Sequence, residues 1–184
     1  MPEFPQTELP ADPGRVDSGN LVYFAYGSNM GSRRMQARVP NARQSGTASL
    51  PYHELRFHKI SLIDGSGKCD AFRTGLKDDR VMGVLYHLGQ DDLPTLDRFE
   101  GQGVGYERDE VDVLLDSGEC IRAFTYFATR INPALQPMDW YLEHVLRGAG
   151  EAGFPEDYIA RIESVASIPD PDSSRREHEL SIYQ

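Results

Sequence analysis

Glu100 is the residue whose position in the sequence points most directly to chemistry. In the segment DDLPTLDRFEG (residues 91–101), helical spacing puts Leu93, Leu96 and Glu100 at i, i+3 and i+7, on one apolar face. Glu100 also lies at the C-terminal end of this helix, where the macrodipole disfavours an anion by about 0.3–1 kcal/mol. Burial and the dipole both raise the pKa of a carboxyl group, which suits a general base working near neutrality. A frayed helix end would instead turn Glu100 into solvent, whereas Asp97, facing away, is predicted to be solvated.

A second candidate site is the turn that follows a predicted buried strand. The segment VYFAYGSNM (residues 22–30) starts with apolar residues without alternation, which is typical of a strand covered on both faces. Gly27, Ser28 and Asn29 then break the strand, and a helical pattern follows as far as Pro40. Backbone N–H groups at such a helix start favour a bound carboxylate or phosphate. A hydrolase nucleophile at this turn is disfavoured, because the Gly-x-Ser-x-Gly pattern is absent.

The elements that must position these two sites are mostly strands. Turn clusters at 64–67, 77–79 and 116–118 separate strand-like runs predicted at 53–63, 69–75, 81–88, 106–115 and 121–128. Helical periodicity is found at about 34–38, 91–100, 138–146 and 155–165. Strands that follow one another with few helices between them predict an α+β fold. We expect a small mixed β-barrel with helices packed outside.

Length and composition indicate one domain. The 184 residues suffice for a single core, and 39% hydrophobic with 26% charged residues are typical of globular proteins. We expect the domain to span residues 21–168, between a flexible N-terminal tail (1–20) and a loosely held C-terminal tail (169–184). Residues 1–20 do not read as a signal peptide, and no apolar run approaches the roughly 20 residues that span a bilayer. A cytoplasmic location without membrane contact is therefore expected.

Charge and metal-ligand spacing exclude several classes of partner. The net charge of -10, from 19 Lys and Arg against 29 Asp and Glu, argues against nucleic acid. Cys69 and Cys120 lie far apart, which indicates neither a disulfide framework nor a zinc site. The five histidines show no metal-binding spacing. We predict a small-molecule partner, no metal, no cofactor, and a monomer or homodimer.

The YGSN turn (residues 26–29), taken with the Glu100-Gly101 pair, resembles the γ-glutamylcyclotransferase family, whose members include AIG2-like proteins. Three further segments are similar to the family: RRMQARVPNA, GVGYERDEVDV and WYLEHVLRGAGEAGFPEDYIARI. The resemblance therefore extends from about Leu21 to Ser167. It implies the same small barrel and the cofactor-free release of 5-oxoproline from γ-glutamyl amines or dipeptides.

The resemblance also implies roles for individual residues. Glu100 takes the place of the catalytic acid/base. The substrate-binding candidates are Tyr23, Phe24, Ala25, Tyr26, Gly27, Ser28, Asn29, Tyr106 and Tyr141. From the residues alone, Tyr106, Tyr126 and Tyr141 read as core or interface aromatics. A related branch that cleaves glutathione carries Leu at the position of Asn29, so glutathione is the less favoured substrate.

Two questions stay open at the level of sequence. The barrel could bind a γ-glutamyl or amino-acid metabolite without turnover, as a sensor or a scaffold, although the acid on the apolar helix face favours catalysis. The amine that leaves could come from a γ-glutamyl amino acid, a γ-glutamyl-lysine fragment or a protected biosynthetic amine. These substrates share the glutamyl half and differ only beyond it.

Overall fold

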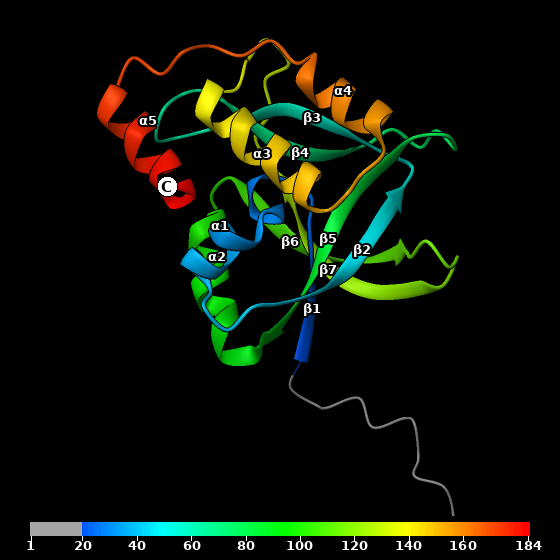
Figure 1. The fold of residues 1–184 in the computed structure, drawn as a ribbon. Coiled ribbons are helices and arrows are strands. Elements are labelled where there is room, and N and C mark those ends of the chain that lie inside the picture. The colour runs from blue at the N-terminus through cyan, green and yellow to red at the C-terminus, as the bar shows by residue number, and fades with distance from the viewer. Residues whose placement is uncertain (1–19) are drawn as a thin grey trace, which may run out of the picture.

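The computed structural model describes residues 20–184, and its centre is a closed five-stranded barrel (Figure 1). The strands follow the order β1-β5-β2-β6-β7 around the barrel. Their bounds are Asn20–Ala25 (β1), Arg80–Gly89 (β5), Arg43–Pro51 (β2), Tyr106–Leu114 (β6) and Cys120–Ala128 (β7). Neighbours are antiparallel except β1 and β7, which run parallel and close the barrel where Tyr23 pairs with Phe124. The mixed barrel predicted from the sequence is confirmed.

A separate two-stranded sheet lies at one end of the barrel. It pairs β3 (His53–Ile60) with β4 (Gly67–Arg73) in antiparallel fashion, and the register shifts between Arg56 and Lys59. The β4 strand also contacts β7 of the barrel. This hairpin carries Cys69 and Lys59 toward the sites described below.

The helices of the described region lie outside the barrel, as predicted. Figure 1 shows α1 and α2 together on one side, and α3 contacts both α4 and α5. Their bounds are Ser32–Arg38 (α1), Leu93–Glu100 (α2), Asp139–Glu151 (α3), Glu156–Glu163 (α4) and Ser173–Leu180 (α5). Short 3₁₀ turns cover Ser28–Met30 (η1), Gln90–Asp92 (η2) and Ser181–Tyr183 (η3). Within residues 20–184, no helix is long and apolar enough to cross a membrane.

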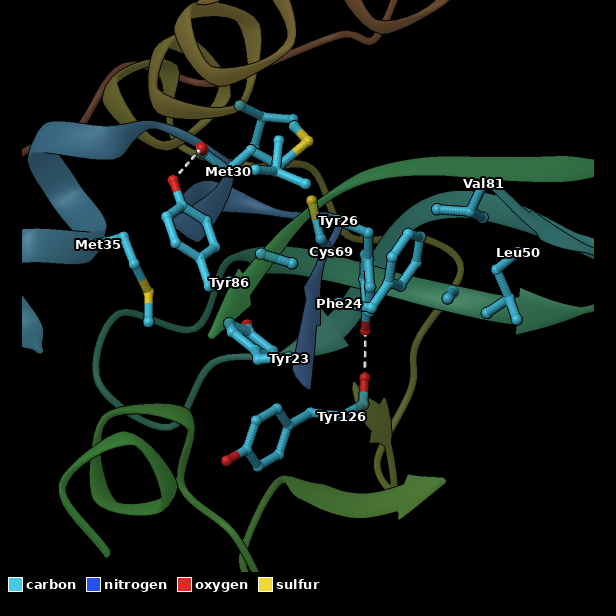
Figure 2. Close-up of a cluster of buried hydrophobic side chains, with 14 of the residues drawn as sticks. Tyr23, Phe24, Tyr26, Met30, Met35, Leu50, Cys69, Val81, Tyr86 and Tyr126 are labelled. Atoms are coloured by element: carbon cyan, nitrogen blue, oxygen red, sulfur yellow. Dashed lines mark hydrogen bonds between the residues drawn. The ribbon is translucent and has the colours of Figure 1, made fainter. Parts of the chain in front are cut away.

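The barrel interior is the hydrophobic core (Figure 2). Phe24, Met35 and Val81 are completely buried, and Tyr86 is nearly so. The Tyr86 hydroxyl donates a hydrogen bond of 2.8 Å to the Met30 carbonyl, which attaches the turn after β1 to the barrel wall. The turn after β1 is therefore attached to the close-packed core of the barrel.

Two parts of the chain differ from the sequence-based expectation. Strand β2 was not predicted, because RQSGTASLP has little strand character and forms through pairing with β5 and β6. The expected loose C-terminal tail is instead an ordered helix, α5, capped by Asp172. This segment docks on α3: the Trp140 indole donates to Asp170 (2.7 Å), and the hydroxyl of Tyr183 lies 2.7 Å from His144 Nδ1.

Candidate active site

The turn after β1 is held tightly against its surroundings. Residues Ser28, Asn29 and Met30 of η1 are all buried, and the Met30 N–H donates to the Gly27 carbonyl (3.0 Å). A side chain at Gly27 would place its Cβ 3.0 Å from the Cβ of Cys69, a tight contact, so this close approach of β4 favours glycine. The N–H groups at the start of a helical turn lack intrahelical partners, as the sequence predicts for this corner.

Glu100 is the last residue of α2, and Gly101 ends the helix. Gly101 adopts a left-handed conformation (φ 73°) and donates its N–H to the Asp97 carbonyl (2.9 Å). Leu96, one turn earlier, is completely buried and fixes the apolar face of α2 against the core. Glu100 therefore leaves the helix on the inward face, as its spacing predicts.

The carboxylate of Glu100 meets the turn directly. Its Oε1 accepts hydrogen bonds from Asn29 Nδ2 (2.5 Å) and from the Tyr23 hydroxyl (3.3 Å). Arg38 donates in turn to Asn29 Oδ1 (2.8 Å), which orients the amide with its nitrogen toward Glu100. The two segments singled out in the sequence thus form one hydrogen-bonded site.

Burial raises the pKa of Glu100 above its usual range, whereas the charge of Arg38 and the Tyr23 hydroxyl act in the opposite direction. The residue as a whole stays partly exposed because it also faces an outer cavity. Burial also raises the pKa of Tyr23, with the nearby Glu100 charge adding to the effect. Tyr23 is therefore a neutral hydroxyl that donates to a carboxylate whose own pKa is raised by burial.

A small cavity of about 30 Å³ joins Glu100 to the turn. Most of its lining is polar, with tyrosine hydroxyls and the turn as the main features. The lining residues are Tyr23, Tyr26, Gly27, Ser28, Asn29, Cys69, Glu100, Tyr106, Tyr126 and Tyr141. Eight of the ten candidates named from the sequence are among them. Phe24 and Ala25 are not, because both are completely buried in the barrel core.

Tyrosines from three elements fix the walls of this inner cavity. Tyr106 donates to the Cys69 carbonyl (2.5 Å), and the Cys69 N–H donates to the Tyr141 hydroxyl (3.1 Å). Tyr26 donates to the Tyr126 carbonyl. Burial raises the pKa of the Cys69 thiol to about 12, so this sulfur stays protonated and is a poor nucleophile.

Tyr126 and Cys69 were not identified as site residues from the sequence. Tyr126 lies on β7 two residues beyond Phe124, and this apolar alternation is indistinguishable from core packing. Its hydroxyl donates to Asp97 (2.7 Å), which also pairs with Arg108 (2.6 Å). The prediction that Asp97 is a solvated acid is therefore wrong: this carboxylate is engaged behind the site.

An outer cavity of about 170 Å³ adjoins the inner one and shares Ser28, Glu100, Tyr106 and Tyr141 with it. Its walls come from α1, the β3–β4 hairpin, α3 and α5. The Glu100 residue thus lies at the junction between a small cavity and a larger one.

Comparison with known proteins agrees with this geometry. Residues 80–162 match the AIG2-like family. The chain is 30% identical to human γ-glutamylcyclotransferase over 154 residues, covering 81% of this chain and 80% of the human protein. It is 34% identical over 116 residues to AIG2-like protein D of Arabidopsis thaliana, covering 61% and 70% of the two chains. A solved γ-glutamyl cyclotransferase structure superposes with a TM-score of 0.79 at 27% identity, covering 88% of this chain and 98% of that one. The chain belongs to the γ-glutamylcyclotransferase family.

Proposed function

We propose that this protein cyclises the γ-glutamyl group of a γ-glutamyl amine or dipeptide, releasing 5-oxoproline and a free amine. The observation that carries the proposal is the Glu100 carboxylate, hydrogen-bonded to Asn29 and Tyr23 at the junction of the two cavities. The human relative of 30% identity bears the name γ-glutamylcyclotransferase, which supports an enzyme of this kind.

The inner cavity would bind the glutamyl half of the substrate. Its α-carboxylate would accept hydrogen bonds from backbone N–H groups of Gly27, Ser28 and Asn29. This anchor folds the chain so that the α-nitrogen lies close to its own γ-carbonyl carbon. Oriented intramolecular attack of this kind lowers a barrier by up to about 7–11 kcal/mol, so no external nucleophile is required.

Glu100 would first remove a proton from the substrate α-ammonium, which makes the nitrogen a nucleophile. The nitrogen then attacks the γ-carbonyl carbon, and the bond between that carbon and the amide nitrogen breaks. Glu100 returns its proton to the departing nitrogen as the bond breaks. The ring nitrogen then releases its second proton, which the free amine takes up as it becomes an ammonium ion, so protons balance over the cycle. The raised pKa of Glu100 favours both transfers, because it lies nearer to neutral pH than the pKa of a solvated carboxyl group does.

Tyr141 is the proposed donor to the oxygen that becomes negative during attack. Its hydroxyl oxygen accepts from the Cys69 N–H (3.1 Å), and the residue lines both cavities together with Glu100. Burial raises the pKa of Tyr141 well above its usual range, so the proton is retained and available for donation. A preorganised donor of this type stabilises an oxyanion without reorganisation of solvent.

The test compares wild type, Glu100→Gln and Glu163→Gln with γ-glutamyl-alanine, scored by 5-oxoproline released. Glu163 is exposed at the end of α4 and serves as the matched control. We expect Glu100→Gln to remain folded and to lose at least about 10²-fold in rate, because acid–base catalysis contributes about that much. Retention of more than about a tenth of the rate would contradict the role of Glu100. Tight binding by wild type without product would favour the metabolite sensor instead.

Several expectations from the sequence stay predictions. They are the cytoplasmic location, the monomeric or homodimeric state, the independence from cofactors, and the absence of a nucleic-acid partner. The discrimination against glutathione by Asn29 is also a proposal. In this structure Asn29 donates to Glu100, a bond that Leu at this position could not make.

A further inference from the structure

The outer cavity has an unusual balance of charge for so acidic a chain. Its lining includes five basic and three acidic side chains, although the whole chain carries a net charge of -10. The basic residues are Arg34, Arg38, Lys59, Lys68 and Arg175, and the acidic ones are Asp64, Glu100 and Glu179. Charges beyond about 8 Å are screened at physiological salt, so a ligand here responds to this local set.

Three of the five basic residues are already paired with carboxylates. The pairs are Arg34–Glu179 (2.7 Å), Lys68–Asp64 (2.8 Å) and Arg175–Asp170 (2.5 Å). Arg38 has a different partner, because it donates to Asn29 and its guanidinium lies 5.3 Å from the centre of the Phe99 ring. These four cations therefore hold the protein's own groups in place.

Lys59 is the remaining cation. Within residues 20–184, no carboxylate oxygen lies within 4.0 Å of its Nζ, which stands 4.6 Å from the centre of the Tyr106 ring. The side chain is only partly exposed. Burial lowers the pKa of Lys59, whereas the charges of Glu100 and Asp64 act in the opposite direction from beyond contact distance. A partly desolvated ammonium with no carboxylate in contact is unfavourable, and an anion bound directly beside it would stabilise the charge.

The position of Lys59 relative to Glu100 identifies the part of a substrate that it would meet. Tyr106 lines both cavities, so the ammonium that lies against its ring is at the outer side of the junction. With the glutamyl half in the inner cavity and its γ-carbonyl at Glu100, the amine half extends outward past Tyr106. A carboxylate one carbon from the departing nitrogen would then face Lys59.

We propose that Lys59 binds a carboxylate on the amine half of the substrate, so that the preferred leaving group is an amino acid with a free α-carboxylate rather than a plain amine or an amide. This inference rests on the proposed function and deepens it, because it assigns a residue of the outer cavity that determines substrate specificity. Lys59 contacts the ligand through charge and takes no part in proton transfer.

The test uses two substrates that differ only in that carboxylate, γ-glutamyl-alanine and γ-glutamyl-alaninamide. Each is measured with wild type, Lys59→Met and Lys77→Met; Lys77 is exposed in the β4–β5 turn and is the matched control. We expect wild type to show a KM at least about tenfold lower for the acid, as befits a charge-assisted hydrogen bond. Lys59→Met should raise the KM of the acid by about the same factor, leave the amide within about twofold, and change kcat little.

Two results would overturn the inference: equal KM values of wild type for acid and amide, or an unchanged preference for the acid in Lys59→Met. Calorimetric binding of the same compounds to Glu100→Gln, with and without Lys59→Met, gives the same comparison without turnover. If no variant and no substrate yields 5-oxoproline, the proposed function fails. The role of Lys59 is then still decided by whether the acid loses its binding advantage.

Discussion

At the scale of single residues, the site is a carboxylate under two opposing influences. Burial favours the protonated form of Glu100, whereas the Tyr23 hydroxyl, the Asn29 amide and the Arg38 charge favour the ionised form. Their balance sets the pH at which the acid can accept a proton. Neither a solvated glutamate nor one fully neutralised by an ion pair would serve both halves of the reaction.

Tyr23→Phe tests this balance. In the proposed mechanism Glu100 must be ionised to take the substrate proton, so kcat/KM should fall as the pH drops through the pKa of Glu100. Tyr23 stabilises the ionised form, and its removal should raise that pKa and move the acid limb of the pH profile upward by about 0.5–1 unit. The ring still packs on Phe124.

The same profile measured for Tyr52→Phe provides the control, because Tyr52 is exposed and far from Glu100 in the chain. An acid limb that stays in place in Tyr23→Phe would show that its hydroxyl does not act on Glu100.

At the scale of elements, the C-terminal helix is the least expected part of the fold. Helix α5 has no fully buried residue, and Leu180, which packs against the core, is its one apolar side chain; its other docking contacts are made by charged groups. Arg34, which is almost fully buried, pairs with Glu179 (2.7 Å) and donates to His144 Nε2 (2.9 Å). A guanidinium has only donors, so His144 is neutral and its Nδ1–H points to the Tyr183 hydroxyl.

Glu179→Gln should therefore loosen α5. Burial alone would raise the pKa of Glu179, but the hydrogen bond and the charge of Arg34 act against it and lower the pKa. This pair contributes stability above the unfolded value of 4.5 and loses it as the pH falls toward 2. In urea at pH 7 we expect the variant to lose about 1–3 kcal/mol of unfolding free energy, and less at pH 3.

Glu177→Gln is the matched control for that experiment, since Glu177 lies on the same helix and is exposed. Equal unfolding curves for the two variants at pH 7 would mean that α5 is not held by the Arg34–Glu179 pair.

Some elements of the fold could be predicted from the sequence and others could not. The turn at 26–29 and the acid at 100 were identified because each breaks a local pattern. The turn interrupts a continuous apolar strand at Gly27, and Glu100 places a charge on the apolar face of a helix. Strand β2 and helix α5 have no such local signal, because pairing on both edges and ion pairs to distant residues create them. Lys59 was missed for the same reason, since only the fold brings it beside Tyr106.

At the scale of the whole molecule, the site depends on closure of the barrel. Strands β1 and β7 meet in a single parallel pairing at Tyr23 and Phe124, and the Thr125 hydroxyl supports it by donating to the Phe24 carbonyl (2.7 Å). Thr125 is completely buried. The seam that closes the barrel therefore carries Tyr23, one of the two donors to Glu100.

Thr125→Val should open this seam without a change in volume. The Phe24 carbonyl would lose a partner in a buried setting, so we expect a loss of about 1–3 kcal/mol of unfolding free energy by chemical denaturation. Thr47→Val, on the partly exposed face of β2, should change stability by less than about 0.5 kcal/mol. A seam variant as stable as this control would show that the hydroxyl does not support closure.

The two cysteines differ in exposure, so the rates at which they react with a thiol reagent can measure transient opening of the site. Cys120 is exposed at the start of β7, whereas Cys69 is enclosed in the inner wall, with its thiol held protonated. An alkylating reagent will modify Cys120 at once, and it will reach Cys69 only when the wall between β4 and the YGSN turn parts. The slow phase of thiol labelling therefore measures how often the pocket opens, and a ligand that fills it should slow that phase alone.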